Sequence, residues 1–198
     1  MRRLAVVMIT VVTMTSTATA QNVTLGFSAG ASASDVRSPD ITSSDFRVGP
    51  VFGAHFGIRF SEDWGLAFQG NWVQKGAKNA GGVDVKLGYF DMPVLANFFL
   101  PAGSVDLVFF SGGSFNLSLT CDIGATGQTL GACPATGTGS VEILEFAIPF
   151  GVGVGLPVGG SQLVFDLRYD LGLSSVLEGE SVKNSVFKAM ARWQFGLR

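Results

Sequence analysis

Charge and histidine are scarce in this chain of 198 residues. Asp, Glu, Lys and Arg together make up 14% of it, and His55 is the only histidine. The formal net charge is −2, so the chain lacks the basic excess with which nucleic-acid-binding proteins neutralise phosphates. A single histidine also offers no cluster of imidazole ligands for a metal. We therefore expect no nucleic-acid partner, no cofactor and no metal site.

Long apolar runs are also missing after residue 20, so no later segment could cross a membrane as a helix of about 20 apolar residues. Even so, 47% of the chain is hydrophobic, and it contains 27 glycines and 17 phenylalanines. This combination would be unusual for a soluble enzyme. Strands are the remaining way to place such a chain in a membrane.

Residues 1–20 have the three parts of a secretory signal peptide. Arg2 and Arg3 precede an apolar stretch at residues 4–12, and small residues follow up to an Ala-x-Ala site. A membrane anchor is the alternative, but the apolar stretch is too short to span a bilayer. We predict cleavage after Ala20, which leaves residues 21–198 as one domain of 198 − 20 = 178 residues. Without the two arginines, 11 basic residues face 15 acidic ones, a net charge of −4.

The segment from residue 64 to residue 75 alternates between two kinds of side chain. Trp64, Leu66 and Phe68 share one parity, whereas Gln69 and Asn71 lie on the other. Such alternation predicts a strand with one apolar and one polar face. The same pattern returns along the rest of the chain in segments longer than ordinary globular strands.

We predict eight strands, at residues 23–34, 47–60, 64–77, 85–100, 105–120, 141–158, 162–176 and 184–198. Short connections follow the second, fourth and sixth strands. Longer ones follow the others, at residues 35–46, 78–84, 121–140 and around 178–183. An even strand number with short and long connections in alternation is typical of bacterial outer-membrane barrels. The sequence therefore predicts an all-β, eight-stranded antiparallel up-and-down transmembrane β-barrel in the bacterial outer membrane, with both mature termini in the periplasm.

The alternation alone does not say which parity faces the inside. A soluble barrel of the lipocalin kind has the same strand number but buries its apolar side chains. Here rows of phenylalanine on one parity suit lipid, and charges among glycines on the other suit a polar lumen. Because eight strands leave just enough interior for side chains, these charges should pair. The expected lumen network comprises Arg47, His55, Arg59, Lys75, Asp91, Asp106, Glu145, Asp166, Arg168, Asp170, Lys188 and Arg192.

The two cysteines, Cys121 and Cys133, fall in one stretch rich in glycine and threonine. In an exported protein the simplest interpretation is a disulfide that closes this loop. In the chain-entropy description such a bond stabilises by about 3 kcal/mol.

The tryptophans suggest where the membrane boundaries lie. Trp64 and Trp72 share a face and are eight residues apart, which corresponds to roughly 20 Å of membrane depth in a tilted strand. We expect these two residues to mark opposite interfaces, and Trp193 and Phe195 to belong to the periplasmic girdle of aromatic side chains.

Two functions other than a structural role are open. A narrow pore, or a path for protons or small solutes, could be lined by Arg59, Asp106, Glu145, Asp166 and Arg168.

The other alternative is an intramembrane lipid hydrolase, in which His55 serves Ser28, Ser111 or Ser114 as a nucleophile. This hypothesis ranks lower, because His55 is predicted to face inward between two glycines and no serine motif follows it closely.

Several short motifs resemble the outer-membrane β-barrel domain family of the PorT type. They are QKGA at residues 74–77, YFDMPVL at 89–95, RYDLGL at 168–173 and the final segment 184–195. The resemblance spans essentially the whole mature chain. It implies an eight-stranded outer-membrane barrel, a group in which most members have no assigned activity. Such barrels usually end in an aromatic residue that the insertion machinery reads, whereas this chain ends at Arg198, three residues after Phe195.

We therefore expect a monomer without catalytic activity that acts structurally or through its external loops. Function tends to lie on loops that a rigid scaffold holds, and residues 35–46 and 121–140 are the expected contact surfaces. The expected partners are outer-membrane lipid, the barrel assembly machinery and an extracellular ligand at the loops.

Overall fold

The computed structural model describes residues 22–38, 44–133, 140–176 and 181–197. The predicted signal peptide lies outside these residues, as do parts of the loops predicted at 35–46 and 121–140. Within the described ranges, no helix is long and apolar enough to cross a membrane.

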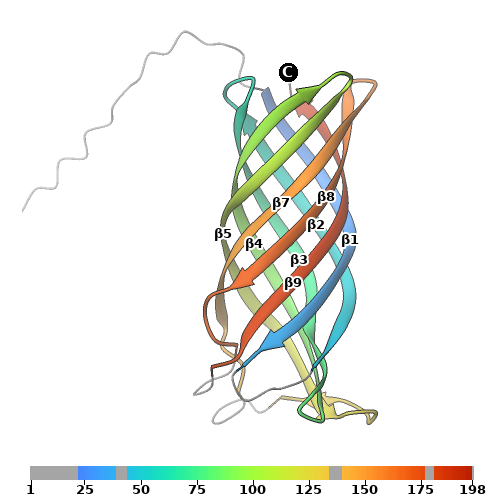
Figure 1. Cartoon of the computed structure of the whole chain (residues 1–198), viewed down its shortest axis with the longest axis vertical. Coiled ribbons are helices and arrows are strands. Elements are labelled where there is room, and N and C mark those ends of the chain that lie inside the picture. The colour runs from blue at the N-terminus through green and yellow to red at the C-terminus, as the bar shows by residue number, and fades with distance from the viewer. Residues whose placement is uncertain (1–21, 39–43, 134–139, 177–180, 198) are drawn as a thin grey trace, which may run out of the picture.

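In the part of the chain that the structure describes, eight long strands and one two-residue strand make up the fold (Figure 1). The long strands are β1 (Asn22–Arg37), β2 (Asp45–Arg59), β3 (Trp64–Ala80), β4 (Val83–Ala102), β5 (Val105–Ala125), β7 (Leu144–Val158), β8 (Ser161–Gly172) and β9 (Lys183–Leu197). The short strand β6 (Gly131–Ala132) pairs with the end of β5.

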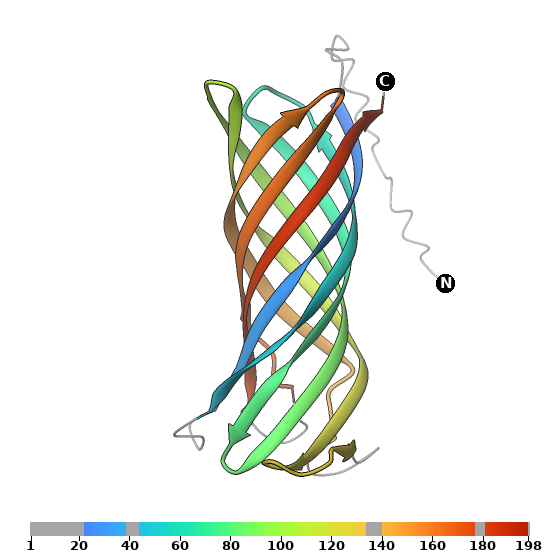
Figure 2. The same ribbon diagram turned by 90° about the vertical axis from the view of Figure 1, so that its right-hand side faces the viewer.

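The long strands close into a ring. Each is antiparallel to the long strand next to it in the chain, and β1 pairs with β9 to join the two chain ends. This last pairing runs from Val23 opposite Leu197 to Arg37 opposite Lys183. Figures 1 and 2 show the closed barrel and its tilted strands from two sides. The predicted eight-stranded antiparallel barrel is confirmed.

The two ends of the barrel differ. The terminus end holds Asn22, Leu197 and the short connections at residues 60–63, 103–104 and 159–160. At the opposite end, which we call the loop end, lie the turn at 81–82 and the described residues of the connections from β1 to β2, from β5 to β7 and from β8 to β9.

The outer wall is apolar and the interior is polar. Phe27 is 67% exposed and Leu167 is 63% exposed on the outside, whereas Lys75 and Asp91 are fully buried inside. A soluble barrel would have the reverse arrangement, because water rather than lipid would face its outer wall. The lipocalin alternative is therefore wrong for this chain.

The long connection predicted at residues 78–84 is wrong. β3 continues to Ala80 and β4 begins at Val83, so only Gly81 and Gly82 connect them. Both glycines have a positive φ, of 61° and 85°, which residues with a Cβ rarely adopt. These two glycines permit a tight hairpin where the polar composition suggested a loop.

The pairing of β4 with β5 contains a β-bulge that reverses the alternation in β5. Tyr89 pairs with Ser118 and Gly88 with Thr120, so Leu119 is the extra residue. Beyond it Cys121 pairs with Leu87, whose side chain is fully buried in the lumen. The bulge thus turns Cys121 inward and lets β5 run to Ala125 rather than to the predicted residue 120.

Other strand boundaries also differ from the prediction at the loop end. β1 extends to Arg37 rather than 34, β2 begins at Asp45 rather than 47, and β9 begins at Lys183 rather than 184. β7 begins at Leu144 rather than 141, and β8 ends at Gly172 rather than 176. Past β8 the chain turns over the lumen, where Val176 is buried and its backbone bonds Glu142 and Val182. Val176 is apolar because it covers the end of the lumen, and the sequence pattern alone does not distinguish it from a residue of the strand.

A positive charge on the outer wall should destabilise the barrel according to its depth. Phe68, 42% exposed, lies midway between Trp64 and Trp72, whereas Leu100, 46% exposed, lies beside a short turn. We expect Phe68→Arg to lower the free energy of unfolding by about 2–4 kcal/mol and Leu100→Arg by about 1 kcal/mol or less. Urea unfolding in lipid vesicles measures both, and a larger loss for Leu100→Arg would contradict the assigned membrane position.

Candidate functional site: the lumen and the loop end

The lumen is filled by side chains from every long strand. The inward residues alternate with the apolar outer ones, so each strand contributes polar groups to one narrow interior. Ten of the predicted network residues are buried, and the other two, Arg59 and Asp106, are partly exposed at the terminus end.

Lys75, Asp91, Lys188, Asp170 and Glu145 form the central cluster. The Lys188 Nζ lies 2.6 Å from both the Asp91 and the Asp170 carboxylates. The Lys75 Nζ lies 2.9 Å from the other Asp91 oxygen and 3.9 Å from Glu145. All five side chains are almost completely buried, so these charges depend on one another for compensation.

A second cluster lies nearer the terminus end. The Arg192 Nη2 donates to both oxygens of Asp166, at 2.9 and 3.1 Å, and its Nη1 lies 2.9 Å from the His55 Nδ1. The other ring nitrogen of His55 lies 3.3 Å from the Thr24 hydroxyl. This arrangement occupies both nitrogens of the only imidazole in the chain.

The terminus end opens into a small vestibule of about 230 Å³, lined by His55, Arg59, Asp106, Gln162 and Arg192 among others. Arg59 pairs with Asp106 at 3.6 Å, and the Gln162 amide donates to Asp106 at 3.0 Å. The clusters of Arg192 and Lys188 lie behind this vestibule. It is therefore a recess at one end rather than a passage through the barrel.

Arg168 occupies the space between the two clusters. Its Nη2 donates to Gln69 at 3.0 Å, and its guanidinium lies over the Phe110 ring at 5.1 Å. Gly151 makes this possible, because a Cβ there would meet the Phe110 ring at 2.7 Å. Phe110 packs with Leu95 and other apolar residues into an apolar layer of the lumen.

Apolar side chains close the lumen toward the loop end. Leu87, Tyr89 and Val176 form one buried cluster, and Val36, Ala77, Ala80 and Val182 form another. Beyond the central charges, apolar side chains therefore occupy much of the lumen toward the loop end.

Several important lumen residues were not among the predicted ones. Asp84 pairs with Arg47 at 3.8 Å, although it was assigned to a loop. The Asn184 amide donates to Glu145 at 2.7 Å. With Asp84 included, the lumen network holds equal numbers of basic and acidic side chains. The basic ones are Arg47, Arg59, Lys75, Arg168, Lys188 and Arg192, and the acidic ones are Asp84, Asp91, Asp106, Glu145, Asp166 and Asp170. The alternation of the predicted strands already places Asn184 and Gln69 on the inward side. Asp84 could not be predicted in this way, because its inward position depends on how far the β3–β4 hairpin extends.

The residues of the hydrolase hypothesis are not brought together. His55 bonds Thr24 and Arg192, so neither ring nitrogen is left to serve Ser28 as a base. The Ser111 hydroxyl donates to the Pro149 carbonyl, and the Ser114 hydroxyl is hydrogen-bonded to the Asn116 amide. Among the described residues, the geometry therefore brings none of these serines into contact with the imidazole as nucleophile and base.

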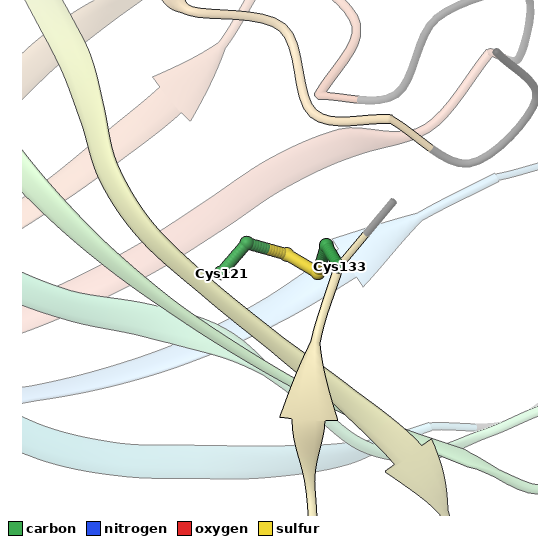
Figure 3. The surroundings of a disulfide bond; sticks show 2 residues. All are labelled: Cys121 and Cys133. Atoms are coloured by element: carbon green, nitrogen blue, oxygen red, sulfur yellow. A yellow bond between two sulfur atoms is a disulfide. The ribbon is translucent and has the colours of Figure 1, made fainter. Parts of the chain in front are cut away.

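Cys121 and Cys133 are joined by a disulfide, with their Cα atoms 5.4 Å apart (Figure 3). The bond does not close a free loop, because Cys121 lies within β5. The backbone N–H of Cys133 donates to the Cys121 carbonyl at 3.1 Å, and β6 pairs with β5 beside it. The disulfide therefore staples a small hairpin at the loop end.

The predicted interfacial aromatics lie on the outer wall. Trp64 contacts Phe98 at 5.0 Å between ring centroids, Trp72 contacts Phe52 at 6.4 Å, and Phe195 contacts Phe27 at 6.4 Å. Trp193 is 42% exposed near the end of β9. Their depth in a bilayer stays a prediction.

Removing one central carboxylate should cost far more stability than removing a peripheral one. Asp91→Asn leaves the buried Lys75 and Lys188 beside an amide, and we expect it to lower the free energy of unfolding by about 3–5 kcal/mol. Asp106→Asn, whose partner Arg59 is partly exposed, is the control and should cost about 1 kcal/mol or less. Urea unfolding in detergent micelles, followed by tryptophan fluorescence, gives both values. Equal losses would show that the central cluster is not the main electrostatic support.

Solved structures that are similar to this chain come from several bacteria. Neisserial surface protein A is 13% identical, with 87% of this chain and 97% of that chain covered at a TM-score of 0.56. A major outer membrane protein from Thermus thermophilus is 12% identical, with 87% and 99% covered at a TM-score of 0.52. The attachment invasion locus protein Ail of Yersinia pestis is 17% identical, with 87% and 98% covered at a TM-score of 0.47.

No curated protein matches the sequence. A protein family described as the outer membrane protein beta-barrel domain matches residues 19–178. The match covers most of the chain and agrees with the closed barrel, its apolar outer wall and its polar lumen. This chain belongs to the outer-membrane protein β-barrel domain family.

Proposed function

We propose that this protein is a non-conducting, non-catalytic outer-membrane barrel that acts through the end bearing its disulfide. The observation that carries the proposal is the filled lumen. Paired charges at Lys75, Asp91 and Lys188 adjoin apolar side chains at Leu87 and Tyr89, so the interior behaves as a protein core.

A narrow pore is the alternative that the charges suggested. For ions to pass, the pairs around Asp91 and Asp166 would have to separate, and unpaired charges at that depth are costly. The cluster of Leu87, Tyr89 and Val176 adds an apolar layer beyond them. The lumen is therefore better explained as structural support than as a path.

The hairpin of β5 and β6 is the best-supported binding element. A disulfide and a backbone hydrogen bond hold its base, and residues 126–129 at its tip are exposed. A surface ordered before binding loses less conformational entropy when a partner docks. We propose an extracellular ligand here, on a monomeric barrel of the PorT type.

We further propose that the terminus end faces the periplasm and the loop end faces the exterior. Outer-membrane barrels have short periplasmic turns and longer external connections, which supports this orientation. Phe195, near the end of β9, would then be the aromatic residue available to the barrel assembly machinery.

The filled lumen predicts a silent bilayer. Folded protein reconstituted in a planar bilayer should give no discrete current steps across a range of pH and salt, because buried charge pairs and apolar side chains occupy the lumen of the described strands. Insertion is verified by the faster gel migration of unboiled protein recovered from the membrane, and a porin of known conductance serves as positive control. Reproducible steps that disappear in Arg168→Ala would instead make the lumen a pore.

The orientation predicts which turns can be reached from outside the cell. An epitope inserted between Gly127 and Gln128 should bind antibody on intact cells, whereas the same epitope between Gly159 and Gly160 should bind only after permeabilisation. Both sites are exposed turns, so the two insertions are matched. The opposite labelling pattern would reverse the proposed orientation.

A further inference from the structure

The outer wall is recessed where β1 pairs with β9. The outward side chains there include Ala31, Ala33 and Ala189, which carry only a methyl group. Larger outward side chains border them, and together they form an apolar groove of about 460 Å³, which we call the alanine groove. Its walls are Val48 on one side and Phe150, Val152, Leu167, Tyr169 and Phe187 on the other.

Two cations lie on the same face, beyond the groove toward the loop end. Arg37 and Lys183 are directly paired in the β1–β9 register and point outward by strand alternation. Like charges directly opposite each other destabilise a sheet. Neither forms an ion pair among the described residues, and both line a surface depression of about 410 Å³.

Among the described residues, Asp35 is the acidic residue of this face, and other groups already bind it. Its Oδ1 accepts from the Ser44 hydroxyl at 2.5 Å and from the Val36 N–H at 2.7 Å. Asp35 therefore balances at most one of the two cations. The remaining positive charge lies where an anion would relieve the repulsion between Arg37 and Lys183.

A polar step separates the cations from the groove. The hydroxyls of Tyr169 and Ser185 are 2.8 Å apart, and Ser185 lies opposite Asp35 in the register. From Ala33 to Arg37 the strand rises roughly 13 Å at about 3.3 Å per residue. Along the barrel wall, the two cations come first, then the two hydroxyls and then the apolar groove. A membrane lipid has its charged headgroup, its polar linkage and its acyl chain in the same order.

We propose that this face binds an anionic membrane lipid, with its phosphate between Arg37 and Lys183 and an acyl chain in the alanine groove. Arginine forms paired hydrogen bonds with phosphate, and cations near a membrane surface attract anionic lipids. The groove faces the hydrocarbon of the bilayer. An acyl chain that fills it therefore replaces contacts with lipids that are less tightly packed against the wall.

A second copy of this chain is a poorer occupant. Two-fold contact through the groove would place identical surfaces together. The two sets of Arg37 and Lys183 would then approach each other, which adds repulsion rather than relieving it. A free phosphate is also poorer, because it would leave the groove unoccupied.

Native mass spectrometry of the folded full chain tests the proposal with two lipids that share myristoyl chains. Dimyristoylphosphatidylglycerol should form adducts on the order of tenfold more readily than dimyristoylphosphatidylcholine. Arg37→Gln with Lys183→Gln should abolish this preference. Ala31→Phe with Ala189→Phe should weaken the adducts of both lipids, because the added rings fill the groove.

Lys78→Gln with Lys86→Gln is the matched control, since it removes the same charge from exposed residues of β3 and β4 at the loop end. This variant should keep the lipid preference, and a gel shift on boiling checks that every variant is folded. The proposal is overturned if the wild type binds both lipids equally, or if the control loses the preference as fully as the Arg37 and Lys183 variant. It is also overturned if inorganic phosphate binds as well as the anionic lipid. The same holds if the groove variant alters the amount of dimer in the spectra and leaves the lipid adducts unchanged.

Discussion

The structure depends first on the closure of its backbone hydrogen bonds. Lipid offers no donor or acceptor, so every strand inside it needs two paired neighbours and no edge can stay open. The pairing of β1 with β9 satisfies this requirement for the chain ends, from Val23 to Arg37. Once the ring of eight long strands is closed, its narrow interior can hold side chains but little else. The polar lumen, its charge pairs and the apolar wall all follow from that closure.

Closure also explains why the charges matter more to stability than to transport. Alternation sends every second residue inward, and those residues must either be small or find partners. Lys188 and Asp91, 97 residues apart in the chain, meet because β9 and β4 face each other across a narrow lumen. This pair and the pair of Lys75 with Glu145 connect strands that share no backbone hydrogen bonds. The same contacts that hold the barrel together therefore close it, and they leave the ends and the outer wall as the surfaces available for recognition.

Much of this architecture could be read from the sequence, because period-two alternation directly reflects the two faces of a barrel strand. The strand number, the barrel type and the inward parity of residues such as Asp91 and Arg168 follow from that pattern. Features that interrupt the alternation were not predictable from it. The bulge at Leu119 turns Cys121 inward. The Gly81–Gly82 turn places Asp84 in β4, where it forms an ion pair with Arg47 of β2. Partner choice inside the lumen also depends on how the ring closes, which no local pattern encodes.

The two faces of a strand are not independent, and β9 illustrates the consequence. Lys188 and Ala189 are adjacent in the chain, and the first joins the central charge cluster while the second forms the floor of the alanine groove. Because Lys188 is held by two carboxylates, β9 has a fixed register and a fixed height relative to β4 and β8. The positions of the outward residues of β9, from Lys183 to Ala189, are therefore fixed as well. A packed lumen can therefore serve recognition on the outer wall without conducting anything, since it keeps the cations and the groove at a constant separation.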